Sequence, residues 1–311
     1  MNTQLSIDGT VPLSHWGLIR ARGAEAVKFL QGQLTNDVAT MDLSHARLAG
    51  FCSAKGRLQA SFIVLELAHD ELLLACAASV LPATLKRLSM FVLRAQCKLT
   101  DASAELALVG AAGPSARAML ADTPVWGTRA IAGGTLLRLP DVGDVPRCML
   151  ARADAENMQT QPALSLDAWR SLEVQSGIPL IEAATVEQFV PQMLNYELIG
   201  GVDFQKGCYP GQEVVARSQY RGTIKRRMFL FECDALAHAG QEVFHGADAT
   251  QPAGMVVNAA PLADGRGSNA LVEVKLAALG DGSLHLGAAD GAVLRLGALP
   301  YAVPVEATSP A

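Results

Sequence analysis

The pattern of apolar runs changes near Arg226, and this change divides the 311-residue chain into two parts. Before Arg226, strand-like and helix-like runs alternate. After it, short apolar runs at residues 228–231, 255–257, 270–276 and 293–296 are separated by Gly, Asp and Pro turns. A chain of this length is too long for one small core. We therefore predict an α+β region over residues 1–226, and a small β-barrel or sandwich over residues 227–311.

The α+β region is expected to combine strands in hairpins with short helices. Strand content marks residues 11–22 and 71–78, and a hairpin is predicted over residues 46–67 with its turn at residues 54–57. Helical spacing marks residues 23–34 and 83–91. A strand and a helix are expected over residues 106–121, and a strand pair at 135–139 and 147–151. Residues 154–162 read as a loop. Ser165 is expected to cap a helix over residues 166–176, which Gly177 ends.

The composition is typical of a globular protein. Hydrophobic residues make up 50% of the chain and charged residues 18%. Residues 1–9 lack the basic and apolar regions of a signal peptide, and the run at 72–81 is about half of the roughly 20 residues that span a bilayer. The six cysteines form no CxxC pair, and the net charge is −5. We predict a cytoplasmic protein with reduced thiols, no membrane contact and no broad coating by nucleic acid.

The residues from Lys206 to Glu213, with the sequence KGCYPGQE, have the character of a site. Two glycines and a proline favour a tight turn that carries a thiol, an ammonium, a phenol, an amide and a carboxylate. Cys208 lies near a predicted helix start and close to Lys206, which would stabilise its thiolate, although a structural cysteine in a turn is the alternative. Tyr209, Gln212 and Glu213 complete the group. Gln212 and Glu213 either contact a polar ligand or only occupy the first turn of the helix.

A basic strip follows this motif. Arg217, Arg221 and Lys225 are four residues apart, so a continuing helix would place them on one face. Such a face is usually a solvated surface, and an anionic ligand or an RNA phosphate is the second interpretation. Trp16 and Trp169 are either core residues or flat surfaces for an aromatic ligand. The sequence has no GxGxxG, Walker A or GxSxG motif, and its six histidines have no metal-ligand spacing, so no metal site is predicted.

These motifs carry a family resemblance. The chain resembles the YgfZ-type folate-binding proteins, relatives of the glycine-cleavage T-protein, which is an aminomethyltransferase. The family hallmark K-G-C-Y-x-G-Q-E is met by residues 206–213 without departure. The similarity runs nearly end to end, and it includes residues 29–38, 54–56, 169–179, 189–192, 221–222, 225–226 and 299–301.

The resemblance implies a fold and a function. The fold is a ring of two α+β subdomains that form a folate-binding body, joined by a C-terminal β-barrel. The implied cofactor is a reduced folate, tetrahydrofolate, in contact with Trp16 and Trp169. The implied function is support of iron–sulfur enzymes, including those that thio-modify tRNA, and it depends on Cys208. For the polyanionic glutamate tail of folate, the basic strip offers Arg217, Arg221 or Lys225.

The chain also departs from the T-protein. The positions of that enzyme's Asp-Asp pair, which includes the catalytic carboxylate, are Ala60 and Ser61 here. Neither residue can act as a carboxylate base. The T-protein's pterin-contacting Glu corresponds to Gln175, which keeps hydrogen-bonding ability but loses the charge. Glu173 is not expected to compensate, because two residues rotate it by about 200° around a helix. Aminomethyl transfer is therefore disfavoured, while folate binding is expected to remain.

Three hypotheses follow. The leading one is a folate-binding protein that assists the assembly or repair of iron–sulfur enzymes through Cys208. The second is a folate-dependent C1 transferase in which another residue replaces the missing carboxylate. The third is a tRNA-binding module that uses the basic strip.

Overall fold

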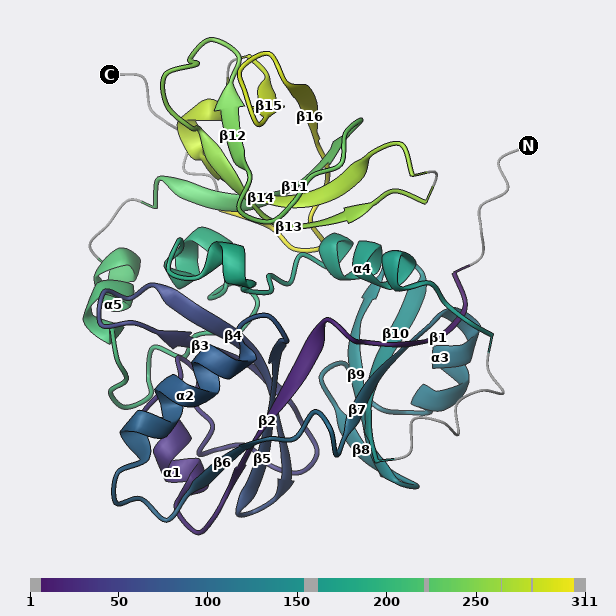
Figure 1. Ribbon diagram of the computed structural model, residues 1–311, viewed down its shortest axis with the longest axis vertical. Coiled ribbons are helices and arrows are strands. Elements are labelled where there is room, and N and C mark those ends of the chain that lie inside the picture. The colour runs from purple at the N-terminus through teal and green to yellow at the C-terminus, as the bar shows by residue number, and fades with distance from the viewer. Residues whose placement is uncertain (1–6, 154–161, 221–223, 264, 281, 305–311) are drawn as a thin grey trace.

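Three antiparallel sheets organise the chain in the computed structural model, which describes residues 7–153, 162–220, 224–263, 265–280 and 282–304 (Figure 1). The first sheet has the order β3-β4-β5-β2-β6, with β2 Trp16–Arg22, β3 Arg47–Cys52, β4 Leu58–Ala68, β5 Glu71–Ala77 and β6 Lys98–Asp101. The second has the order β1-β7-β10-β9-β8, with β1 Gly9–Pro12, β7 Ala107–Ala112, β8 Thr128–Ile131, β9 Gly134–Val142 and β10 Val145–Arg152.

The first sheet is buried on both faces, which explains why β4 and β5 are almost continuously apolar. Successive side chains on a strand point to opposite faces. Leu72 and Leu74 therefore join the core under α1 (Ala26–Gln31) and α2 (Leu81–Val92), whereas Leu73 joins a second core with Leu137 of the second sheet. The helix α3 (Gly113–Leu120) covers the other face of the second sheet.

The C-terminal part is a closed six-stranded barrel in the order β11-β14-β13-β12-β15-β16. Its strands are β11 Arg226–Cys233, β12 Glu242–His245, β13 Gly254–Pro261, β14 Ser268–Lys275, β15 Leu284–Leu286 and β16 Ala292–Leu296. Pairing of β11 with β16 closes the sheet. The alternating side chains fill one interior core, so the fold is the barrel and not the sandwich.

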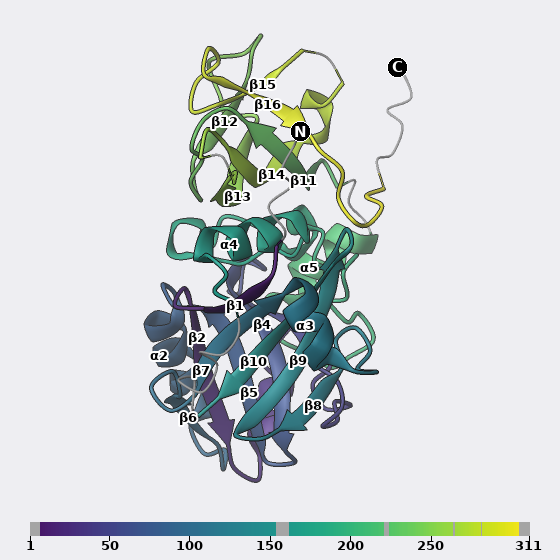
Figure 2. The ribbon, with the colours of Figure 1, turned by 90° about the vertical axis from the view of Figure 1, so that its right-hand side faces the viewer.

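The helix α4 (Leu166–Gln175) lies between the barrel and the two sheets (Figure 2). The Ser165 side chain accepts a hydrogen bond from the Ala168 backbone N–H at 3.1 Å, which confirms the predicted N-cap. Gly177 follows with φ +69°, a conformation that favours glycine. Short 3₁₀ helices at Ala183–Thr185 and Pro191–Leu194 lead to α5 (Gln212–Tyr220), and a third lies at Leu276–Ala278.

The prediction of one strand over residues 11–22 was wrong. The chain forms β1 and β2, which belong to different sheets, because it turns between Leu13 and Trp16, where the Trp16 N–H bonds to the Leu13 carbonyl. This crossing links the two sheets covalently. The predicted hairpin is confirmed as β3 and β4. The short strands β6 and β8 were not predicted, because they are polar edge strands with few buried residues. The loop predicted at 154–162 lies, except for Pro162, outside the described residues.

No helix among the described residues is both long enough and apolar enough to cross a bilayer.

Candidate functional site

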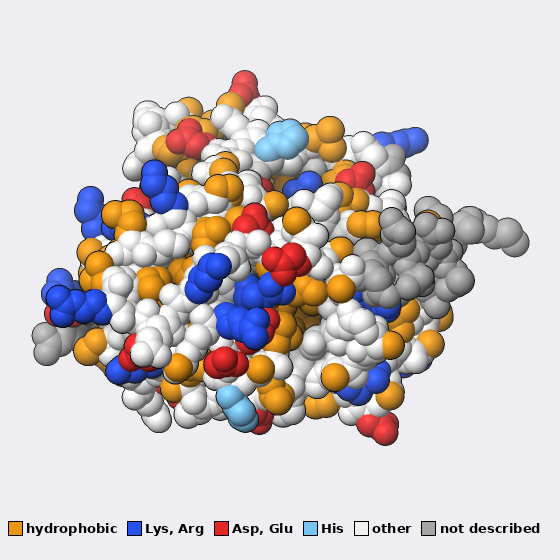
Figure 3. Space-filling model, turned by 60° about the horizontal axis from the view of Figure 1, so that its bottom comes forward, with side chains coloured by type: hydrophobic (Ala, Val, Ile, Leu, Met, Phe, Trp, Pro, Cys, Tyr) orange, Lys and Arg blue, Asp and Glu red, His pale blue; other side chains and the backbone are white. Residues whose placement is uncertain are grey.

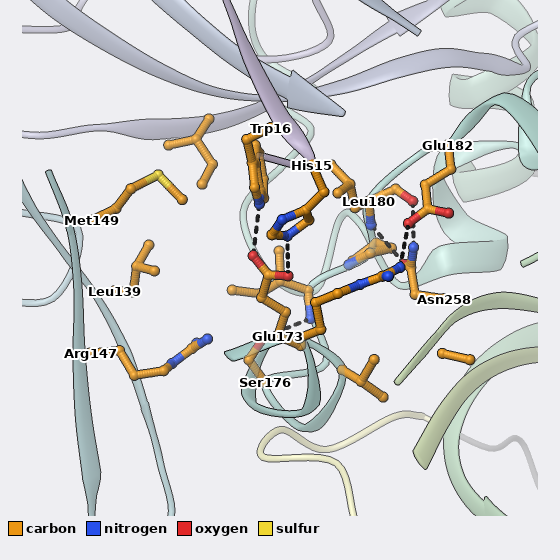
Figure 4. Close-up of a pocket in the computed structure, with 16 residues that line it drawn as sticks. His15, Trp16, Leu139, Arg147, Met149, Glu173, Ser176, Leu180, Glu182 and Asn258 are labelled. Atoms are coloured by element: carbon orange, nitrogen blue, oxygen red, sulfur yellow. Dashed lines mark hydrogen bonds and ion pairs between the residues drawn. The ribbon is translucent and has the colours of Figure 1, made fainter. Parts of the chain in front are cut away.

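The carboxylate of Glu173 is the centre of a hydrogen-bonded cluster on α4 (Figure 4). Its Oε1 accepts the indole N–H groups of both Trp16 and Trp169, each at 2.7 Å. Its Oε2 lies 2.7 Å from Nε2 of His15. His15 and Trp16 stand where the chain enters β2, so this carboxylate ties α4 to the first sheet. The structure thus brings together the two predicted tryptophans, through a residue that was not expected to take part.

Glu173, and not Gln175, faces the cavity beside α4. The Gln175 amide donates to the Ser171 hydroxyl at 2.9 Å, on another side of the helix. The separation of about 200° around the helix places Glu173, and not the half-buried Gln175, at the cavity. Whether Glu173 takes over the role of the lost carboxylate toward a ligand stays a prediction.

The two tryptophans differ in accessibility. Trp16 is half-buried and lines the cavity, whereas Trp169 is fully buried. A Cβ on Gly110 would lie 2.7 Å from the Trp169 ring, and the Arg147 guanidinium lies 5.8 Å from the ring centre. Trp169 therefore presents no open face in this structure, and it orients Glu173 through its N–H. Direct contact of Trp169 with a folate stays a prediction.

The cavity lies where α4, the second sheet and the barrel meet. Its lining includes Trp16, Leu139, Met149, Glu173 and Asn258, from β2, β9, β10, α4 and β13 respectively. The Asn258 side chain exchanges two hydrogen bonds with the backbone of Leu180, which joins the barrel to the segment after α4. The enclosed volume is about 50 Å³, well below the roughly 300–1,000 Å³ of small-molecule pockets. A ligand of pterin size therefore requires side chains to move.

Charged residues of both signs surround this space. Arg147 is 1% exposed, and burial lowers its pKa to about 10, opposed by the nearby Glu173 charge, so it is protonated at neutral pH. Arg170 pairs with Glu182 at 3.6 Å, and burial raises the pKa of Glu182.

Sequence reasoning missed Arg147 and His15. A signal for Arg147 was available, since it interrupts an otherwise apolar buried strand.

The segment 206–213 is anchored away from this cavity. The Lys206 ammonium donates to the Gln31 and Leu34 carbonyls at 2.5 and 2.6 Å, just after α1, and lies 5.2 Å from the centre of the Tyr209 ring. Desolvation lowers the pKa of Lys206 to about 8, so most of it carries a proton at neutral pH. Burial raises the pKa of Tyr209. Lys206 and Tyr209 therefore fix the shape of the segment.

A close backbone approach explains two glycines. Gly211 has φ +81°, and a Cβ there would lie 2.3 Å from the Ser53 carbonyl oxygen and 2.7 Å from Gly56. Gly56, in the β3–β4 turn, has φ +69°, and a Cβ there would meet Val214 at 2.8 Å. The turn at residues 54–57 and the segment 206–213 therefore fit together as one unit.

Cys208 is the exposed cysteine of the six. Burial raises the pKa of Cys52, Cys76 and Cys148 to about 12, so these thiols stay protonated and are poor nucleophiles. Gln212 is half-buried and Glu213 is exposed, and both lie in the first turn of α5. Cys208 is thus open to a reactant or a partner protein, but it does not line the cavity beside Glu173.

The basic strip is not one helical face. The helix α5 ends at Tyr220, so it does not continue to Lys225, and Arg221 lies outside the described residues. Arg217 and Lys225 are exposed. The two arginines that follow pair internally, Arg226 with Glu273 and Arg227 with Glu197. On the face drawn in Figure 3, acidic and basic side chains are intermixed around an apolar hollow, with no continuous basic surface.

Ala60 and Ser61, which the family resemblance aligns with the T-protein's acidic pair, are closed to solvent. Ala60 is 0% and Ser61 4% exposed, and the Ser61 hydroxyl accepts the Ile181 backbone N–H at 2.9 Å. This hydrogen bond attaches the segment after α4 to β4.

Among the described residues, no group of three or more His, Cys, Asp or Glu could hold a metal ion.

Replacing Gly110 with alanine is expected to destabilise the protein through the buried ring of Trp169. The new Cβ would overlap the rigid, buried ring of Trp169, and such overpacking costs about 1–3 kcal/mol of unfolding free energy. Chemical denaturation measures the loss. Gly280→Ala is the control, because a Cβ there meets nothing within 4 Å. Equal stability of Gly110→Ala and wild type would contradict the packing of Trp169 described above.

Comparisons with known proteins agree with this architecture. Residues 8–153 match the family described as the GCVT N-terminal domain. The fold is similar to the glycine cleavage system aminomethyltransferase T from Bartonella henselae, with a TM-score of 0.76 and 19% identity over 94% of this chain and 86% of that one. This match confirms the predicted T-protein-like α+β fold with a C-terminal barrel.

The sequence is similar to proteins named tRNA-modifying protein YgfZ. The relative from Sodalis glossinidius is 30% identical over 94% of this chain and 93% of its own length. The relative from Serratia proteamaculans is 31% identical over 82% and 81%, and that from Colwellia psychrerythraea 33% over 70% of each. At this identity and coverage, the chain belongs to the family of the tRNA-modifying protein YgfZ.

Proposed function

We propose that this protein binds a reduced folate, tetrahydrofolate, in the cavity beside Glu173 and supports the modification of tRNA. It does so by assisting iron–sulfur enzymes, and it acts on them through Cys208. The observation that carries the proposal is the convergence of Trp16, Trp169 and His15 on one carboxylate at that cavity. The family name supports the link to tRNA modification, and the T-protein-like fold supports the folate.

The cavity lining suits a folate. Trp16 offers an indole to a pterin or aminobenzoyl ring, and Leu139 and Met149 supply apolar contacts. Glu173 uses one lone pair of Oε2 on His15, and further lone pairs can accept from a ligand N–H. Since the enclosed volume is small, the half-buried Trp16 and His15 are the side chains that binding would displace.

The folate site and the thiol form two separate parts. No residue of the segment 206–213 lines the cavity. In addition, the positions of the T-protein carboxylates hold Ala60 and Ser61, which supports a binding protein over an aminomethyltransferase. A single cysteine is a poor permanent ligand set for a cluster, which normally takes four ligands. We therefore assign Cys208 to transient contact with a partner or a reactive species.

Titration with tetrahydrofolate under anaerobic conditions, followed by tryptophan fluorescence and calorimetry, tests the folate site. Wild type is expected to bind with a change in fluorescence. Trp16→Phe should lose most of that change and weaken binding about tenfold, since the smaller ring offers less contact area and has no N–H to hold Glu173 in place, a loss of about 1–2 kcal/mol. Trp126→Phe is the control, because Trp126 does not line the cavity. No heat and no fluorescence change with wild type would refute folate binding.

A further inference from the structure

Arg147 is a buried cation that forms no direct ion pair with the described residues, although the charges of Glu173 and Asp141 act on it from a longer distance. Its Nε and Nη2 donate to one acceptor, the Pro140 carbonyl, at 3.1 and 3.0 Å. No carboxylate of the described residues lies within 4 Å of its guanidinium, and its Nη1 has no hydrogen-bond partner among them. Arg147 lines the cavity, so the nitrogen that the protein leaves without an acceptor is available to donate to a ligand there.

The guanidinium is held in one orientation. Arg147 pairs with Leu139 across β10 and β9, which brings the Pro140 carbonyl next to Nε and Nη2. The Trp169 ring lies 5.8 Å from the guanidinium carbon. Because the Pro140 carbonyl holds Nε and Nη2 of the planar guanidinium, Nη1 points in a fixed direction and is a preorganised donor. In Figure 4, the Arg147 side chain reaches from the second sheet toward α4, where Glu173 stands.

The charge around the cavity favours a neutral ligand group. The two buried or half-buried cations, Arg147 and Arg170, are matched by the carboxylates of Glu173 and Glu182. A dianionic tail placed here would disturb this balance in a site of low polarity. A neutral ligand group that accepts a hydrogen bond from Arg147 and donates hydrogen bonds to Glu173 would preserve this charge balance. The cavity therefore presents a fixed donor on one wall and a fixed acceptor on another.

We propose that Arg147 donates from Nη1 to the ring carbonyl oxygen of a neutral planar heterocycle, whose N–H groups donate to Glu173. The inference rests on the proposed folate function and deepens it. It assigns Arg147 to the oxo group of the pterin head, and it excludes the glutamate tail from this end of the cavity. Arg147 then selects oxo heterocycles over analogues that carry an amino group at the same ring position.

Calorimetry with three probes tests the assignment. The probes are tetrahydrofolate, a tetrahydropterin without the tail, and the 2,4-diamino counterpart of that pterin, in which an amino group replaces the oxo group. Arg147→Met is expected to weaken tetrahydrofolate and tetrahydropterin about 10- to 100-fold, because a charge-assisted hydrogen bond is lost. Binding of the diamino probe should change less than about threefold, because an amino group cannot accept from Arg147. Arg147→Lys, which keeps the charge but not the fork, should lie between.

Arg138→Met is the matched control. Arg138 lies on β9 and bonds to the Thr123 carbonyl and to Asp141, and it does not line the cavity. Arg138→Met should leave the affinities for all three probes unchanged.

Loss of tetrahydrofolate binding with unchanged tetrahydropterin binding would place Arg147 at the glutamate tail and overturn the inference. Equal weakening of the tetrahydropterin and of its diamino counterpart, together with a lower melting temperature, would make the role of Arg147 structural and overturn the inference. If wild type binds neither folate nor pterin, the proposed function fails too, whereas binding unaffected by Arg147→Met overturns this inference alone.

Discussion

Cys208→Ala is expected to abolish the support of tRNA modification while leaving the fold and folate binding intact. Cys208 is exposed and lies outside the cavity, so its loss removes a thiol but no packing and no folate contact. The measurement is complementation of a deletion strain. Activity of an iron–sulfur enzyme that thio-modifies tRNA is followed by mass spectrometry of the modified nucleoside. We expect activity at the level of the deletion strain, and tetrahydrofolate affinity within about twofold of wild type.

Two further variants separate the thiol from the shape of its segment. Cys208→Ser keeps size and polarity but not the nucleophilic sulfur, and it should fail like Cys208→Ala. Gly207→Ala should complement fully, because a Cβ there meets nothing within 4 Å. Complementation by Cys208→Ala at the wild-type level would remove the thiol from the mechanism. The family assignment and the fold would be unaffected by that result.

Local patterns account for much of the fold. The hairpin of β3 and β4 follows from two apolar runs with the turn at residues 54–57, and α4 follows from Ser165 and Gly177 at its ends. The barrel strands β11, β13, β14 and β16 contain the four apolar runs after Arg226. These elements are set by neighbours in sequence, so turn residues and periodicity suffice to find them.

The split of residues 11–22 into β1 and β2 could not be found in this way. Both strands are mostly apolar. Pro12 ends β1, but the break at residues 13–15 itself contains no Gly or Pro, and the turn is imposed by pairing with two different sheets. Tertiary context therefore decides where the strand ends.

Some residues of the candidate site could be predicted from the sequence, and others could not. The segment 206–213 and the residues Trp16 and Trp169 were identified from motifs and from the family resemblance. Their common partner was not, because Glu173 is separated from His15 and Trp16 by 158 and 157 positions in sequence. A glutamate on a half-exposed helix is most often solvated, so composition gave no reason to prefer it. The place of Arg147 in the cavity wall depends on how β10 lies relative to α4, which local sequence patterns do not reveal.

Glu173→Leu is expected to damage both stability and folate binding. The substitution leaves the N–H of the fully buried Trp169 without an acceptor, and it also removes the acceptor of Trp16. An unsatisfied buried donor costs about 1–3 kcal/mol, so we expect a loss of about 2–4 kcal/mol of unfolding free energy by chemical denaturation. Loss of the Glu173 carboxylate also removes one of the two negative charges that act on Arg147, so that only Asp141 remains. Tetrahydrofolate affinity should fall at least about 100-fold.

Glu173→Gln distinguishes the charge from the hydrogen bonds. A glutamine oxygen in the place of Oε1 can still accept both indole N–H groups, so most of the stability should remain, with a loss below about 1.5 kcal/mol. Its amide group cannot accept a ligand N–H, and it carries no charge to balance Arg147, so folate affinity should still fall about tenfold or more. If Glu173→Gln bound tetrahydrofolate like wild type, Glu173 would organise the tryptophans without contacting the ligand. If Glu173→Leu were as stable as wild type, the indole N–H groups would have other acceptors, and the cluster would not be the feature that joins α4 to the first sheet.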